Sequence, residues 1–237
     1  MSNAPLDDSG RTLVNLVRTT HPWTAADNAA GFVLRYLAPM RRILIQSLGS
    51  PAEADEALRK LLSHLVTAGF GKHRRGRLRD FLIKGIRSAA MNRISAMPGA
   101  DAGAGAQQTS LDELTSDSKI WLAYWREGLL ERAWRSLERQ EHATPEMPFY
   151  SVLHCATAKP QSTPAMLVVQ IASEFNLTLD EQAVQSTLIT ARGLFAQVLA
   201  DEVAETLEAP SEDDVKEEIA ILGLGKAFSG ITVASNE

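Results

Sequence analysis

One stretch, Gln170 to Ala200, places the tightest constraint on what this chain can fold into. It begins as a short helix that ends near Phe175. A tight corner follows at Asn176-Leu177, where Asn tolerates the left-handed backbone that such a corner needs. Thr178 and Glu181 have the spacing of a capping box and predict the start of a second, longer helix. The apolar residues of that helix recur at steps of four, three, four and three, the period of one helical face: Val184, Leu188, Ala191, Phe195 and Val198.

Two helices joined by a tight turn have two interpretations. The first is a helix-turn-helix that reads DNA. The second is an ordinary helical hairpin, which any all-α protein can contain. The pattern of this stretch alone favours the hairpin.

Composition bounds the class of protein. The chain has 237 residues, of which 45% are hydrophobic and 22% charged, as is typical of a soluble globular protein that could hold two small domains. The single Cys155 excludes an internal disulfide and fits a reducing cytosol. No apolar run approaches the ~20 residues of a membrane span, and the first residues are too polar for a signal peptide. We therefore expect a cytoplasmic protein with no membrane partner.

The net charge of −5 is unevenly distributed. Residues 72–93 hold eight of the 24 Lys and Arg residues and a single acid, Asp80, whereas residues 201–218 hold nine acids and one Lys. A basic segment in an acidic protein indicates an anionic partner such as a phosphate backbone. The alternative is a solvated helix start that is paired with acids elsewhere in the same molecule, and the sequence leaves both open.

Helical periodicity recurs along the chain, and no strand pattern stands out. Pro39 lies inside one helical pattern and predicts a kink or a restart there. Ser50, Pro51 and Glu53 occupy the cap, first and third positions of another helix. In the basic helix, Arg79, Lys84, Arg87 and Arg93 are expected to project away from the buried stripe. The expected helices span about 11–19, 25–48, 51–68, 77–97, 117–141, 149–157, 164–175, from after Thr178 to about 208, and 211–222.

The segment from Pro98 to Ser110 has three glycines and no periodicity, which is typical of a flexible linker. The expected architecture is all-α, with two small helical domains at 1–97 and 114–222. Residues 1–10 are expected to be disordered, residues 98–113 to be the linker, and residues 223–237 to form a loose tail.

Motifs for catalysis are absent from the sequence. There is no P-loop, no dinucleotide-binding glycine pattern, no GxSxG and no HExxH. The five His are scattered, so spacing predicts no metal site. His154 and Cys155 are neighbours on a helix and point about 100° apart, so they do not form a nucleophile-base pair. We expect neither an enzyme nor a cofactor.

Taken in order, several blocks resemble a bacterial RNA polymerase sigma factor of the extracytoplasmic-function type, a divergent branch of the sigma-70 superfamily. The resemblance covers about residues 11–222. The blocks are FVLRYLAPMRR from Phe32, SPAEADEAL from Ser50, GRLRDFLIKGIRSAAMNRI from Gly76, WREGLLERAWRSLE from Trp125, and the helix-turn-helix at Gln170–Leu199.

The resemblance implies a transcription initiation factor that binds core RNA polymerase and directs it to specific promoter DNA. It implies that 1–97 is like the family's second region and that 114–222 is like its fourth region, with the helix-turn-helix. An inhibitory regulatory protein is a further partner that it allows. The implied polymerase contacts are Asp55, Glu56, Arg59 and Lys60. The implied DNA contacts are Arg74, Arg75, Arg77, Arg79, Lys84, Arg87 and Arg93 in the basic segment, and Gln182, Gln185, Ser186, Thr190 and Arg192 in the second helix of the helix-turn-helix.

Three features depart from the family pattern. Arg59 and Lys60 stand where the family usually has Gln and Glu, which places cations against a polymerase surface expected to be basic. The basic run that normally follows Ile94 is missing, and Arg192 is the only cation of the second helix. Phosphate contacts supply much of any protein-DNA affinity. A second hypothesis therefore stays open, namely a sigma-like regulatory module with weakened DNA binding that acts through protein-protein interaction.

Overall fold

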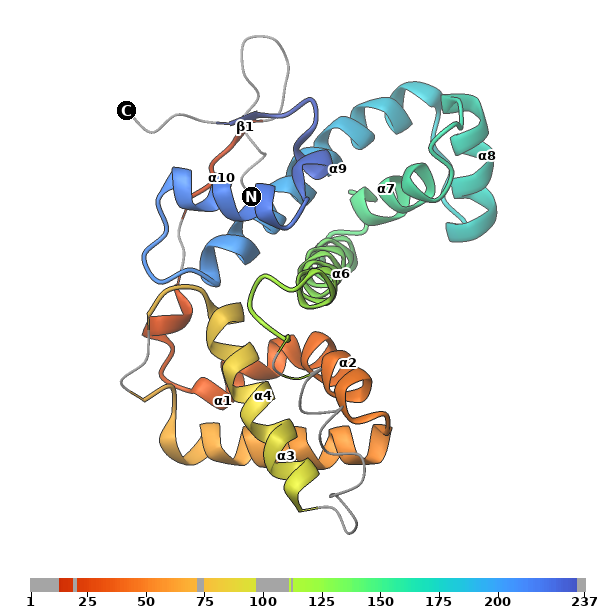
Figure 1. Ribbon diagram of the computed structural model, residues 1–237. Coiled ribbons are helices and arrows are strands. Elements are labelled where there is room, and N and C mark those ends of the chain that lie inside the picture. The colour runs from red at the N-terminus through yellow and green to blue at the C-terminus, as the bar shows by residue number, and fades with distance from the viewer. Residues whose placement is uncertain (1–12, 19–20, 72–74, 97–110, 112, 234–237) are drawn as a thin grey trace. The chain divides into compact units, whose positions relative to one another are not determined.

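The computed structural model describes residues 13–18, 21–71, 75–96, 111 and 113–233, and within them the chain is predominantly helical (Figure 1). The all-α expectation is confirmed. The expected disorder of residues 1–10 and most of the expected linker at 98–113 lie outside the described residues. In chain order the elements are β1 (Leu13–Val14), η1 (Trp23–Ala25), α1 (Ala29–Val33), η2 (Leu34–Tyr36), α2 (Leu37–Leu48), α3 (Pro51–Ala68), α4 (Leu78–Ser95), α6 (Lys119–Ala143), α7 (Phe149–Ala158), α8 (Pro164–Phe175), α9 (Glu181–Glu205), α10 (Glu212–Ile221), η4 (Gly225–Phe228) and β2 (Thr232–Val233).

The chain divides into two compact units. Unit 1 comprises Met1–Arg18, Leu130–Glu202 and Gly223–Glu237, and unit 2 comprises Thr19–Leu129 and Val203–Leu222. The division runs through α6 and α9, so each of these helices contributes to both units. The C-terminal helix α10 belongs with the N-terminal helices, which a sequential division of the chain does not foresee. The expected domains at 1–97 and 114–222 stay a prediction.

Local signals set the helix boundaries of unit 2. The Ser50 side chain accepts a hydrogen bond from the Glu53 N–H (3.4 Å), and Pro51 begins α3, as predicted. Gly49 ends α2 with a φ of 67°, a left-handed conformation that glycine adopts without strain. The restart predicted near Pro39 is also confirmed, because the backbone leaves the helical conformation at Tyr36 before α2 begins.

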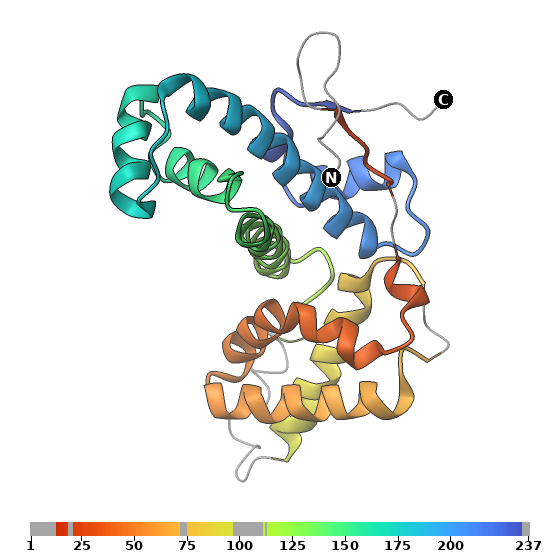
Figure 2. The same cartoon turned by 180° about the vertical axis from the view of Figure 1, so that it is seen from behind.

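In unit 2, α3 packs against both α2 and α4 (Figure 2). The largest buried side chains of this unit include aromatic residues. Trp125 is fully buried and stacks on Tyr36, with 4.8 Å between the ring centroids. Trp23 is fully buried against Phe70 at 5.0 Å and Phe81 at 5.4 Å. Both tryptophans are therefore core residues whose rings are not exposed for stacking on bases.

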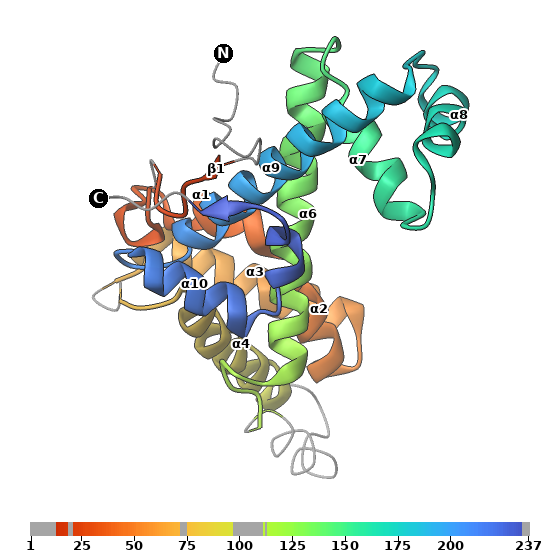
Figure 3. The same cartoon turned by 90° about the horizontal axis from the view of Figure 1, so that it is seen from above.

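In unit 1, α7 and α8 lie beside the start of α9 (Figure 3). Thr163 caps α8 by accepting from the Met166 N–H (3.3 Å), and α8 ends at Asn176 in the left-handed conformation predicted for it (φ 55°, ψ 35°). The predicted capping box of Thr178 and Glu181 is wrong. Asp180 precedes α9 and accepts from the Ala183 N–H at 2.7 Å. The shared core of these helices is formed by Val152, Cys155, Leu167, Ile171 and Val184.

The helix predicted at 11–19 is wrong for the residues described. Leu13–Val14 is the short strand β1, which pairs in parallel with Thr232–Val233. The Asn15 N–H donates to the Gln197 side-chain oxygen (2.9 Å), and the Gln197 amide donates back to the Asn15 carbonyl (2.8 Å). The conformation of this segment is therefore decided by contacts to residues far along the chain. Sequence periodicity does not predict such contacts.

Candidate nucleic-acid interface

The basic segment of the sequence corresponds to the loop before α4 and to α4 itself, in unit 2. Of its predicted DNA contacts, Arg74 lies outside the described residues. Five of the other six fall into two sets. Arg77, Arg79 and Arg93 are held by carboxylates of the same unit, whereas Arg75 and Lys84 are exposed beside a groove. Arg87 is half-buried on α4.

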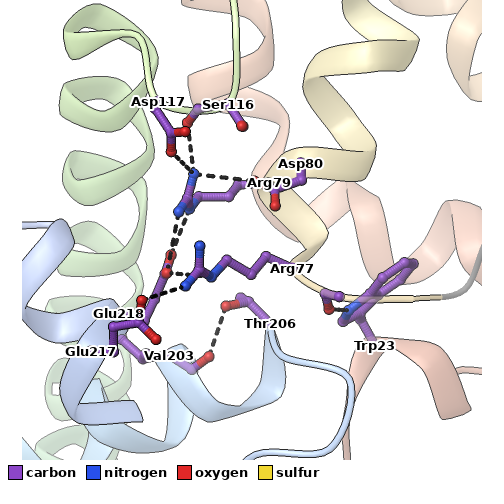
Figure 4. A network of polar contacts seen from close by, with 11 residues as sticks. Trp23, Arg77, Arg79, Asp80, Ser116, Asp117, Val203, Thr206, Glu217 and Glu218 are labelled. Carbon is purple, nitrogen blue, oxygen red and sulfur yellow. Dashed lines mark hydrogen bonds and ion pairs between the residues drawn. The ribbon is translucent and has the colours of Figure 1, made fainter. Parts of the chain in front are cut away.

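Arg79 is buried with 1% of its side chain exposed, so the expectation that it projects to solvent is wrong. Its Nε donates to Glu218 Oε1 (2.7 Å), and one terminal nitrogen donates to the Ser116 carbonyl (2.6 Å) (Figure 4). Glu218, on α10, is also 1% exposed. Burial opposes the charge of Arg79, but the hydrogen bond and charge of Glu218 prevail and raise its pKa. In this conformation the guanidinium is out of reach of a phosphate.

The burial of Arg79 has a simple helical cause. Leu82, Ile83 and Ile86 follow it at three, four and seven positions and are all buried, so Arg79 lies on the apolar face of α4. The spacing was present in the sequence, but the side chain was assigned to the solvent face because of its charge. A paired Arg on an apolar stripe is the pattern of a buried ion pair.

Arg77 is also paired with acids of α10, but its side chain is only partly buried. Its Nε lies 3.0 Å from Glu218 Oε2, and a terminal nitrogen lies 3.2 Å from Glu217 Oε1. The side chain of Arg77 is 29% exposed and that of Glu217 is 62% exposed. The alternative that the basic helix start is paired with acids of the same molecule therefore holds for Arg77 and Arg79. Arg93, at the other end of α4, is similarly paired with Glu53, whose pKa it lowers through a hydrogen bond.

A groove of about 890 Å³ lies between α3 and α4. Its cationic side chains are Lys60 of α3, Arg75 of the loop and Lys84 of α4, and all three are exposed. Among the described residues, neither Arg75 nor Lys84 has a hydrogen bond or an ion pair, whereas Lys60 lies 3.7 Å from Glu56. The apolar side chains that line the groove are Leu61, Leu65, Phe70, Phe81 and Leu82. The groove thus combines unpaired positive charge with apolar surface.

Gly85 sets the closeness of the two helices that form the groove. A Cβ atom at this position would lie 3.1 Å from Cδ1 of Leu61, which is tighter than an ordinary contact. Glycine in a helix interior costs up to about 1 kcal/mol relative to alanine. The close packing of α3 on α4 accounts for that residue here.

Asp80 is the acid that faces this groove, and it lies in the first turn of α4. Burial raises its pKa, although the neighbouring charges of Arg79 and Arg77 act in the opposite direction. One of its oxygens lies 3.1 Å from a terminal nitrogen of Arg79. Its negative charge is therefore partly compensated from within the unit, and the groove keeps a net positive lining.

Sequence reasoning missed three polar residues of the groove, His64, Ser88 and Asn92. Lys84, Ser88 and Asn92 follow one another at intervals of four on α4, and Lys60 and His64 do so on α3. That periodicity was readable, but which two polar stripes would face each other depends on how α3 packs on α4. Lys60 itself was assigned to the polymerase set.

Among the predicted polymerase contacts, Asp55 pairs with a residue of α2, whereas Glu56, Arg59 and Lys60 pair with one another. Asp55 accepts two hydrogen bonds from Arg41 of α2 (2.6 and 3.0 Å), which lower its pKa. Glu56 accepts from Arg59 at 3.1 Å and lies 3.7 Å from Lys60. The two cations that depart from the family pattern are thus partly neutralised by Glu56, one turn earlier on α3.

The predicted DNA contacts of α9 share one face of that helix. Gln182, Gln185, Ser186 and Arg192 are exposed, and Thr190 is half-buried. The Ser186 and Thr190 hydroxyls donate to carbonyls of their own helix, Ala183 at 3.1 Å and Ser186 at 3.2 Å. Ile189 on the same face is 51% exposed. This face offers two amides and one cation to a partner.

Comparison with protein-family models, with curated proteins and with solved structures finds no match. Within the described ranges, no group of three or more His, Cys, Asp and Glu side chains is placed to hold a metal ion. None of the helices in that part of the chain is both long and apolar enough to cross a membrane. The function must therefore be argued from the sites themselves.

Proposed function

We propose that this chain is a transcription initiation factor of the sigma type, which binds core RNA polymerase and directs it to specific promoters. The observation that carries the proposal is the groove between α3 and α4, where Lys60, Arg75 and Lys84 surround an apolar floor. Of these cations, Lys84 lies in the block Gly76–Ile94, which resembles the helix that opens and reads the promoter in the family, and Arg75 directly precedes that block.

The chemistry of the groove fits an unpaired nucleic-acid strand. Lys and Arg neutralise phosphates and release counterions, and apolar and aromatic surface accepts the faces of unstacked bases. Phe81 is half-buried at the groove and Phe70 lies beneath it. Ser88 and Asn92 add hydrogen-bonding groups along α4. The bases of duplex DNA are stacked, so a duplex could contact this protein groove only through its backbone. The favoured ligand is therefore single-stranded.

The geometry of α8 and α9 supports the second element of the proposal, a helix-turn-helix in unit 1. A left-handed corner at Asn176 joins the two helices, and they pack on a common core. Gln182 and Gln185 are exposed near the N-terminus of α9, where a recognition helix contacts base edges. Gln can make two hydrogen bonds to adenine in the major groove.

The single exposed cation of that face, Arg192, limits what α9 binds alone. Phosphate contacts dominate protein-DNA affinity, so isolated unit 1 is expected to hold duplex DNA weakly. Attachment to polymerase raises the effective concentration of a weak DNA-binding element without any new contact. Promoter reading by this chain is therefore proposed to require core polymerase.

A second function is favoured by the exposed face of α8. Met166 is 56% and Val169 is 69% exposed, and Ala165 and Ala172 are exposed beside them. An uncharged apolar face suits a protein partner better than a phosphate backbone. The alternative proposal is a sigma-like regulatory module that acts through protein-protein interaction, with an inhibitory protein among its possible partners.

In vitro transcription with core polymerase on a library of genomic fragments tests the first proposal. Defined start sites are expected with the wild-type chain, and fewer transcripts with the double variant Arg75→Gln/Lys84→Gln. The matched control is Arg135→Gln, which removes an exposed cation of α6 in unit 1. If the wild type neither co-purifies with core polymerase nor directs initiation, the initiation-factor proposal is lost. Binding of a protein partner that is abolished by Val169→Ser would then support the alternative.

A further inference from the structure

The segment Val203–Leu222 contacts the start of the basic helix α4 through several polar groups, all within unit 2. The Gly76 N–H donates to the Glu208 carboxylate at 2.6 Å, and the Leu78 N–H donates to the Thr206 carbonyl at 2.8 Å. Glu217 and Glu218 of α10 hold the two arginines that follow Gly76 (Figure 4). The acidic segment of the sequence therefore lies on its basic segment.

The two arginines are held in different ways. Arg79 and Glu218 are each 1% exposed, so this pair is sealed from solvent. Arg77 is 29% exposed, and its partner Glu217 is 62% exposed at a separation of 3.2 Å. Ion pairs between exposed groups contribute little stability and exchange partners readily. The sealed pair behaves as an anchor. Arg77 is also held by the buried Glu218 through its Nε at 3.0 Å, but its contact with the exposed Glu217 is accessible to a competing anion.

We propose that Glu217 is an internal competitor for Arg77, which keeps this arginine from a nucleic-acid phosphate while the pair of Arg79 and Glu218 anchors α10. The inference rests on the proposed binding of nucleic acid by unit 2. A guanidinium can donate two hydrogen bonds to a carboxylate or to a phosphate in the same bidentate manner. Glu217 thus occupies a position that a phosphate oxygen would take, and the contact is autoinhibitory.

The docking of α10 does not depend on Glu217. Val215, Ile219 and Leu222 are buried, and Glu218 keeps its bonds to both arginines. Neutralising Glu217 is therefore expected to release one terminal nitrogen of Arg77, whose Nε stays on Glu218, without displacing the helix. This separation makes the contact testable by a single substitution on the surface.

The test measures the affinity of the full chain for a short fluorescent single-stranded DNA oligonucleotide by anisotropy over a salt series. Glu217→Gln is expected to tighten binding about 2- to 5-fold and to steepen the logarithmic salt dependence by about 0.7, the value for one further phosphate contact on a single strand. The matched control is Asp213→Asn on the same helix, a residue 96% exposed that faces Lys216 at 3.8 Å. It removes the same charge and is expected to change affinity by less than about 1.5-fold.

The substitution Arg77→Gln identifies the group that is released. In the Arg77→Gln background, Glu217→Gln is expected to give no gain. The inference is overturned if Glu217→Gln and Asp213→Asn act alike, if the gain persists without Arg77, or if none of the proteins binds the oligonucleotide. Transcription with core polymerase separates the two proposals. If Glu217→Gln tightens oligonucleotide binding but the chain directs no initiation, the autoinhibitory contact is supported and the initiation-factor proposal is lost. If the chain directs initiation but Glu217→Gln does not change oligonucleotide binding, the initiation-factor proposal is supported and the autoinhibitory contact is lost.

Discussion

Arg79 and Glu218 face each other in the interior of unit 2, with 2.7 Å between Arg79 Nε and Glu218 Oε1 and 1% of each side chain exposed. The pair joins α4 to α10, and the Ser116 carbonyl accepts a further hydrogen bond from Arg79. Removing one member of a buried ion pair leaves an uncompensated charge. The pair therefore makes the folding of unit 2 depend on a helix near the C-terminus.

Substituting Arg79→Met is expected to destabilise the protein by about 3–5 kcal/mol, because the buried Glu218 carboxylate loses its buried partner and keeps only the partly exposed Arg77. Glu218→Leu is expected to act with similar size for the reverse reason. Urea unfolding followed by circular dichroism measures both.

The double variant Arg79→Met/Glu218→Leu is the decisive control for this pair. Replacing both charges with apolar groups is often close to neutral, so most of the loss should be recovered. Asp117→Asn, which changes a residue 77% exposed at 3.4 Å from Arg79, should cost less than about 0.5 kcal/mol. Additive losses in the double variant would contradict an ion pair as the stabilising contact.

The groove cations give a prediction about salt. Arg75→Gln and Lys84→Gln should each weaken binding to single-stranded DNA about 3- to 10-fold and reduce the slope of log affinity against log salt by about 0.7. Fluorescence anisotropy between low and moderate salt measures both quantities. Arg135→Gln, an exposed cation of α6 paired with Glu131, should leave the slope unchanged. Equal effects of all three substitutions would show that net charge, not the groove, governs binding.

Asn176 provides a test of the corner between α8 and α9. It is the single non-glycine residue with positive φ among those described, and its conformation is left-handed. Asn176→Gly should change the free energy of unfolding by less than about 0.5 kcal/mol, whereas Asn176→Val should cost about 1–2 kcal/mol because a β-branched side chain clashes in this conformation. Thermal unfolding of the two variants measures the difference. Equal melting temperatures would mean that the backbone at position 176 changes its conformation to accommodate valine without loss of stability.

Much of the fold was predictable where a short-range signal decides it. Gly49, Ser50 with Pro51, Thr163 with Pro164, and Asn176 each fix one helix boundary through their own backbone or side chain. The helix ends predicted at 48 and 175 and the helix starts predicted at 51 and 164 are confirmed. The capping box expected at Thr178 does not form, because Leu177 and Leu179 pack against the core of α7, α8 and α9 and the chain stays non-helical as far as Asp180.

Contacts between segments that are distant in the chain could not be predicted from sequence patterns. Leu13, Leu16 and Val17 have a helical apolar spacing, but pairing with Thr232–Val233 makes Leu13–Val14 a strand. The acidic and basic segments were both recognised, yet nothing in their spacing showed that Glu217 and Glu218 would meet Arg77 and Arg79. The sequence predicts only part of the candidate groove, namely Arg75 and Lys84 as nucleic-acid contacts. It does not place Lys60 beside them, because that depends on how α3 packs on α4.

Cys155 tests the integrity of the core shared by α7, α8 and α9. It is fully buried, and its Sγ donates to Glu174 Oε2 at 3.7 Å. Burial, with the charge of Glu174, raises the pKa of the thiol to about 11. At pH 8 such a thiol is about one part in a thousand thiolate, against roughly a quarter for a free cysteine. Reaction with a disulfide reagent should therefore be at least about 100-fold slower in the native protein than in urea.

The pH profile distinguishes the native thiol from a locally opened one. The native rate should rise about tenfold per pH unit up to pH 10, because the thiolate fraction does so below a pKa of about 11. Glu174→Gln should speed the reaction severalfold by removing a negative charge beside the sulfur, while Glu181→Gln, an exposed acid at the start of α9, should not. A profile that levels off near pH 8.5 would instead show that Cys155 reacts from an opened form of these helices. In that case the core around α8 would be less stable than its burial indicates.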